Sequence, residues 1–160
     1  MKSETPPRIV HRSEDYSEGP FRPHGRIEIW IEDAPQGAVI YSVAQGPFNA
    51  EFVKAFQLAR NELLKAKQVT RVFGHLTQFH TSIMASPDAI ESLARHLANV
   101  HKQSISSGIT AWVVAPGVEG RELMLPLFER VHVENGHRFG AFETLAEAQA
   151  WLRSHFEPAP

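Results

Sequence analysis

Histidine is the residue type in this chain with the widest chemical scope. The 160 residues include nine histidines and no cysteine. Six of the histidines form pairs five residues apart, namely His75 with His80, His96 with His101, and His132 with His137. Residues five apart diverge by about 140° on a helix and face opposite sides of a strand. We therefore predict no metal site and expect surface or edge histidines, although histidines from different elements could still converge.

Other catalytic patterns are missing from the sequence. There is no Gly-x-Ser-x-Gly turn and no glycine-rich phosphate loop, and the short Gly117-x-x-Gly120 lacks the lysine that would meet a phosphate. We accordingly predict a protein that is not an enzyme and uses no cofactor. The alternative is a site built on His75 or His80, near the carboxyl ends of strands, where α/β sheets commonly bind ligands.

Composition sets the class of protein and its surroundings. The net charge is −2, with 42% hydrophobic and 21% charged residues, which is the balance of one globular domain with its own core. Such a charge does not attract nucleic acid or an anionic membrane. The absence of cysteine and of a long apolar run predicts a cytoplasmic protein with no membrane segment.

The chain divides into a tail and a domain. Residues 1–25 are rich in proline and charge without an apolar period, so we expect a flexible N-terminal tail, and residues 26–157 form the domain. From Arg26, isoleucines alternate with polar residues, which is typical of a half-buried strand. A turn-forming segment and a second strand over 38–44 follow, so the two strands predict an antiparallel hairpin.

Capping residues mark three of the helices that follow. Asn49 begins a helix, Ser86 begins another with proline in its first turn, and Thr144 with Glu147 forms a reciprocal cap for the last. Strands are predicted over 69–76 and over the apolar run 109–116, which must be covered on both faces.

The segment 121–134 is open to two interpretations. Its apolar spacing favours a helix that ends at Gly136, in spite of Pro126. The alternative is a hairpin around Asn135-Gly136. With the helix, the fold class is α/β: a mixed, mostly parallel five-stranded sheet with four helices and an antiparallel N-terminal hairpin strand.

This order, together with the pattern Arg-Phe-x-x-Phe-x-Thr-Leu-x-Glu-Ala-x-x-Trp-Leu at residues 138–152, resembles STAS-like domains. These have the fold of bacterial anti-sigma-factor antagonists and are related in shape to lipid-carrier domains. The resemblance implies a non-catalytic regulatory module that docks another protein, such as a regulatory kinase or an anti-sigma-like factor.

In the antagonists, the loop after the third strand carries Asp-Ser-x-Gly, whose serine the partner kinase phosphorylates. Here Ser82 falls at the serine position, but Thr81 replaces the aspartate and Met84 stands at the glycine. A plain turn hydroxyl is the alternative for Ser82, and capping already explains Ser86. The interaction or phosphorylation loop implied by the resemblance comprises Phe79, His80, Thr81, Ser82, Ser86 and Asp88.

Two further hypotheses come from exposed and apolar residues. Trp30 lies between Glu28 and Glu32 on the outer face of its strand and is a candidate interface anchor, with burial under the tail as the alternative. Large residues around Met84 and over 123–128 suggest a carrier of a small apolar ligand or lipid. Self-association through a sheet edge, giving a homodimer, is a further alternative.

Overall fold

One mixed sheet carries all the strands in their chain order. The computed structural model describes residues 9–12, 24–34 and 37–155. The strands are β1 (Ile9–Arg12), β2 (Arg26–Ala34), β3 (Gly37–Gln45), β4 (Val72–His80), β5 (Ile109–Val114) and β6 (Arg138–Phe142). The helices are α1 (Ala50–Ala66), α2 (Pro87–Gln103), α3 (Arg121–Glu134) and α4 (Leu145–Ser154).

The predicted α/β class and mixed sheet are confirmed. β2 and β3 form the antiparallel hairpin, and β3 to β6 run parallel to one another. β1 adds a sixth strand, antiparallel to β2, with Ile9 opposite Ile29. The expected tail is therefore wrong for Ile9–Arg12, since the free edge of β2 supplies partners for their backbone groups. Residues 1–8, 13–23 and 156–160 lie outside the described part of the chain.

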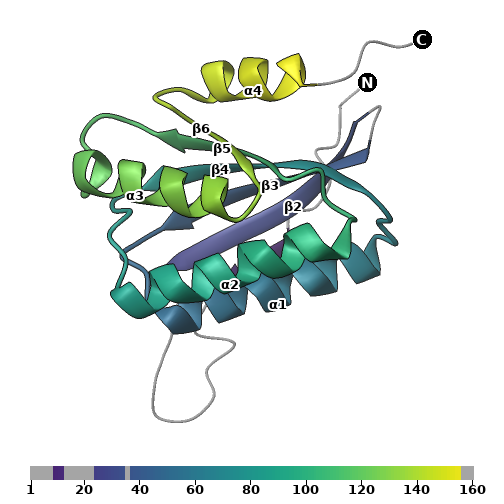
Figure 1. Cartoon of the computed structure of the whole chain (residues 1–160), viewed down its shortest axis with the longest axis horizontal. Coiled ribbons are helices and arrows are strands. Elements are labelled where there is room, and N and C mark those ends of the chain that lie inside the picture. Colours follow the sequence, from purple (N-terminus) through teal and green to yellow (C-terminus); the bar gives the residue numbers. More distant parts are fainter. Residues whose placement is uncertain (1–8, 13–23, 35–36, 156–160) are drawn as a thin grey trace.

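The direction of the crossovers explains where the helices lie. β3 to β6 follow one another in one direction across the sheet, so right-handed connections place α1, α2 and α3 on the same face. Figure 1 shows α1 and α2 side by side on that face and α4 on the opposite one. β5 is covered on both faces and is buried along its whole length, as its apolar sequence predicts.

The predicted helix starts are confirmed by their caps. The side chain of Asn49 accepts a hydrogen bond from the backbone nitrogen of Phe52 (3.0 Å), and Ser86 Oγ accepts one from Ala89 (3.2 Å). Thr144 Oγ1 does the same for Glu147 (3.3 Å). Each cap satisfies a backbone donor that has no partner within its helix.

The helix favoured over 121–134 is confirmed, whereas one predicted strand begins later than expected. α3 continues to Glu134 and Gly136 follows it with a positive φ of 82°, so the alternative hairpin around Asn135-Gly136 is not formed. The strand predicted over 69–76 instead begins at Val72. Val69 lies in the turn that follows α1, where its nitrogen donates to the carbonyl oxygen of Leu64 (3.0 Å).

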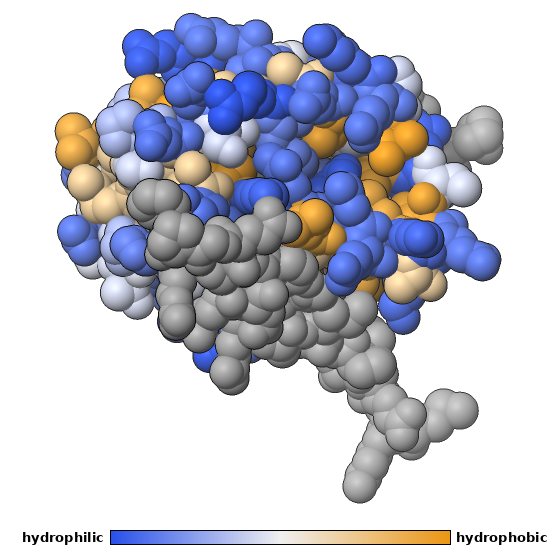
Figure 2. Space-filling view, turned by 90° about the horizontal axis from the view of Figure 1, so that it is seen from below, coloured by the Kyte–Doolittle hydropathy of each residue, from blue (hydrophilic) through white to orange (hydrophobic). Residues whose placement is uncertain are grey.

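The described surface carries few large apolar side chains. Seen from the side of α1 and α2, it is mainly hydrophilic, with hydrophobic residues in a few separate places (Figure 2). Among the described residues, the exposed large hydrophobics are Leu58, Leu123 and Val133. Within the described ranges, no helix combines the length and apolar character needed to cross a bilayer.

Candidate ligand cavity

A cavity of about 110 Å³ lies between the sheet and the helices α1, α2 and α3. Its floor comes from successive same-face residues of the two central strands: His75, Thr77 and Phe79 on β4, and Thr110 with Trp112 on β5. The β4–β5 register sets His75 beside Thr110 and Thr77 beside Trp112. Strand alternation thus supplies a floor in which polar and aromatic groups are mixed.

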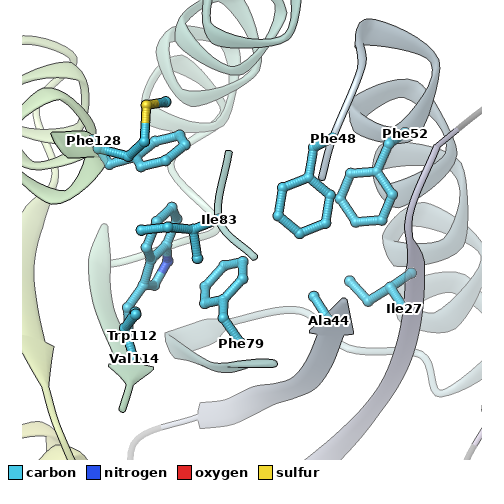
Figure 3. Packing of buried hydrophobic residues seen from close by; sticks show 10 residues of the cluster. Ile27, Ala44, Phe48, Phe52, Phe79, Ile83, Trp112, Val114 and Phe128 are labelled. Atoms are coloured by element: carbon cyan, nitrogen blue, oxygen red, sulfur yellow. The ribbon is translucent and has the colours of Figure 1, made fainter. Parts of the chain in front are cut away.

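Aromatic side chains make most of the apolar wall. Figure 3 shows Phe48 and Phe52 on one side, Trp112 and Phe128 on the other, and Phe79 between them. The ring centroids of Phe48 and Phe52 are 4.3 Å apart, and those of Phe79 and Trp112 are 4.4 Å apart. These rings pack against one another, so they form a continuous apolar wall.

Four histidines line the cavity, each from a different part of the fold. They are His75 on β4, His96 on α2, His132 on α3 and His137 directly before β6. The expectation of surface histidines is wrong for these four. His75 and His96 face inward while His80 and His101, five residues later, are exposed, as the spacing argument requires.

The third histidine pair departs from the spacing argument. Five residues separate His132 and His137, but the turn after α3 brings both inward, and their ring centroids are 6.2 Å apart. The nitrogen of His137 donates to the carbonyl oxygen of His132 (2.9 Å) in that turn. The helix and strand geometries assumed for the sequence therefore do not apply to a pair that spans a helix end.

Burial keeps these imidazoles neutral at pH 7. Desolvation, with the positive charge of Arg60 second, lowers the pKa of His96 to about 3 and that of His75 well below its ordinary value. Burial also lowers the pKa of His132 to about 4, against a hydrogen bond to the carbonyl of Phe128, and lowers that of His137. A neutral imidazole carries one donor and one acceptor.

Backbone contacts fix which nitrogen carries the proton in two of the rings. His132 Nδ1 lies 2.7 Å from the carbonyl oxygen of Phe128, so Nδ1 donates and Nε2 is left as an acceptor. His137 Nε2 lies 3.0 Å from the carbonyl oxygen of Leu97, so Nε2 donates. His137 Nδ1 is buried and has no hydrogen-bond partner among the described residues.

Arg60 on α1 is the charged residue next to this cluster. Its side chain is 1% exposed, and its Nε donates to His75 Nε2 at 3.2 Å. One terminal guanidinium nitrogen is buried without a hydrogen-bond partner. Burial lowers the pKa of Arg60 to about 10, so the group stays charged at pH 7. Within the described ranges, Arg60 forms no ion pair with an acidic side chain.

Sequence reasoning missed Arg60, although a signal was present. Arg60 lies four residues after Phe56 and three before Leu63, which are both on the buried face of α1. Helical spacing therefore places Arg60 on the buried face of α1, whereas a charged side chain is usually expected on the exposed face. A charged residue in phase with the apolar stripe of a helix is the pattern that would have identified it.

The cluster does not suit a metal ion. In the described part of the chain, no group of three or more histidine or acidic side chains is arranged to hold one. A buried guanidinium beside His75 would also repel a cation.

The predicted interaction loop does not form one surface. Phe79 is buried in β4, where it lines the cavity, whereas His80 and Thr81 are exposed. Ser82 is 0% exposed, and its Oγ accepts a hydrogen bond from the nitrogen of Met84 (3.1 Å). Ser86 caps α2. A kinase could reach Ser82 only if this segment opened.

Asp88 and Trp30 differ in exposure. Asp88 is exposed in the first turn of α2. Trp30 is 8% exposed and stacks on Tyr41, its register partner on β3, with ring centroids 5.7 Å apart. Its indole nitrogen donates to Glu32 (3.2 Å). Burial, the alternative to an exposed anchor, is the outcome for Trp30.

In comparisons with protein-family models and with curated proteins, the chain matches none. The resemblance to STAS-like domains therefore stays a prediction that rests on the order of elements and on the pattern at 138–152. The function must be argued from the cavity itself.

Proposed function

We propose that this protein binds a small, largely apolar ligand in the cavity between the sheet and α1, α2 and α3. The observation that carries the proposal is the cavity's composition: aromatic and aliphatic walls with a few polar groups at fixed positions. Ligand sites in proteins commonly have this composition, in which apolar walls give affinity and a few polar groups give orientation.

The energetics of packing support this assignment. Protein interiors are close-packed, and voids larger than a water molecule are few. The space of about 110 Å³ is an exception to this packing, and the side chains that line it lack contacts on that side. A ligand that fills the space recovers the lost contacts.

The volume limits the size of the ligand. An apolar cavity of about 150 Å³ is known to hold benzene, and the cavity here, at about 110 Å³, is somewhat smaller. A ligand with a single ring or a short chain fits this space with small adjustments of the side chains. A long-chain lipid is larger than this volume.

The other two functional hypotheses have weaker support. Docking through the loop after β4 relied on Ser82, which is buried, and on Phe79, which belongs to the cavity wall. A histidine-centred enzyme would pair His75 with an orienting carboxylate, but its hydrogen-bond partner is Arg60. Neither arrangement gives a site as well defined as the cavity.

Titration with toluene tests the proposal. Ala89 on α2 lines the cavity and is 2% exposed, so Ala89→Leu should occupy part of the space. Ala94→Leu, on the same helix but outside the cavity, is the matched control. We expect toluene to raise the Tm of the wild type and of Ala94→Leu, and to raise that of Ala89→Leu much less.

A second readout keeps the test independent of the stability of the variants. Trp112 lines the cavity, so its indole resonance should shift in the wild-type NMR spectrum when toluene is added. The proposal fails if toluene changes neither the Tm nor this resonance in the wild type. It also fails if Ala89→Leu and Ala94→Leu respond equally.

A further inference from the structure

The charge around the cavity is unbalanced. Arg60 is fully buried, is positively charged and has no ion-pair partner among the described residues. It does not itself line the cavity but lies behind His75, which does. No aspartate or glutamate of the described ranges lines the cavity. A buried charge is strongly unfavourable unless an opposite charge and hydrogen bonds compensate it. An anion at this place would compensate it.

The hydrogen bond between Arg60 and His75 determines which nitrogen of the His75 ring carries the proton. Arginine has no acceptor, so its Nε–H donates and His75 Nε2 accepts at 3.2 Å. A neutral imidazole with Nε2 as acceptor carries its proton on Nδ1. No described residue accepts a hydrogen bond from Nδ1, and His75 lines the cavity. The Nδ1–H group of His75 is therefore available to a ligand oxygen.

The imidazoles of His96 and His137 line the same cavity as that of His75. The positive charge of Arg60 lowers the pKa values of His96 and His137 as well as that of His75, so all three lie within range of its field. Being neutral, they add hydrogen-bonding groups without adding charge. The single positive charge of Arg60 would be balanced by one negative charge.

We propose that the ligand is a small monocarboxylic acid, bound as its anion with the carboxylate accepting the hydrogen bond of His75 Nδ1, so that the imidazole of His75 lies between the carboxylate and Arg60. Its apolar body packs against the aromatic wall that Phe48, Phe79 and Trp112 form. This inference rests on the proposed function and names the class of ligand for the same cavity. It follows from an uncompensated buried cation, an oriented imidazole donor and an apolar wall that holds one ring.

Benzoate and benzyl alcohol distinguish a carboxylate from a neutral ligand of similar size. Calorimetric titration of the wild type should show benzoate binding about tenfold or more tightly than benzyl alcohol, as expected for hydrogen bonds strengthened by a charge. Arg60→Met should lose this preference and retain benzyl alcohol. Arg95→Met removes an arginine whose side chain is 65% exposed and serves as the control with unchanged affinities.

The outcomes separate the two proposals. If toluene binds but the wild type does not prefer benzoate to benzyl alcohol, the carboxylate inference is wrong and the apolar-ligand function stands. If Arg60→Met keeps the preference, the inference is also wrong. If no probe binds, the proposed function itself fails. The two-ligand comparison in the wild type decides the matter even where Arg60→Met does not fold.

Discussion

Acidification from pH 7.5 to 5.5 is expected to destabilise the protein, because its buried histidines take up protons mainly on unfolding. The pKa of His96 falls to about 3 and that of His132 to about 4 in the folded chain, against 6.5 for the ordinary side chain. The unfolded state therefore binds more protons below pH 6.5. The stability is fully present above the unfolded pKa and is lost as the pH falls toward the folded one.

The magnitude follows from the two protonation equilibria. In the unfolded chain at pH 5.5, protonated imidazole outnumbers neutral imidazole by about ten to one. In the folded chain, His96 and His132 stay almost entirely neutral at that pH. Each site then costs about 1.4 kcal/mol relative to pH 7.5, and the two together cost about 3 kcal/mol. His75 and His137, whose pKa values are also lowered by burial, act in the same direction.

Urea unfolding followed by circular dichroism at pH 7.5, 6.5 and 5.5 measures this loss. His96→Phe keeps an aromatic ring beside Phe56, whose ring centroid is 5.7 Å from that of His96, and removes the titration. The variant should lose about 1.4 kcal/mol less than the wild type on acidification. His80→Gln removes an exposed imidazole and should follow the wild type. An equal loss in His96→Phe and the wild type would refute the reasoning.

Three further substitutions test the packing and charge of the same region. Arg60→Met should raise the free energy of unfolding of the ligand-free protein by about 1 to 3 kcal/mol, because it removes an uncompensated buried charge; a loss of stability in urea unfolding would contradict this. Ser82→Asp should destabilise by about 3 kcal/mol or more because Ser82 is 0% exposed, whereas Thr81→Asp, at an exposed position, should change the Tm little. Ala89→Leu should stabilise the ligand-free protein by about 1 kcal/mol by filling part of the cavity, and an unchanged Tm would show that the space is not available to it.

Local patterns in the sequence predicted most of the fold. Asn49, Ser86 and Thr144 were recognised as helix caps because a cap depends on residues within one turn of each other. The alternation in β2 and the apolar run of β5 depend only on which faces are covered. β1 was missed because a short edge strand takes its stability from a partner that is distant in sequence.

The candidate site was largely invisible to such patterns. Spacing along the chain separates His75 from His80 and His96 from His101 correctly, but it does not show that His75 on β4 and His96 on α2 line the same cavity. Ser82 appeared to be a loop hydroxyl, and only the pairing of its segment with Glu119 and Gly46 buries it. Both the shared cavity of the histidines and the burial of Ser82 depend on segments that are distant in the sequence.

The sequence by itself determined the elements from β2 onward, their order and the mixed sheet, because caps, turn residues and hydrophobic periods act over a few neighbouring residues. The tertiary structure alone decided the site. Crossovers that progress in one direction brought α1, α2 and α3 over the same face, and this placed Arg60 beside His75 and left a cavity above β4 and β5. Burial and charge compensation depend on that assembly, so no single stretch of the chain encodes them.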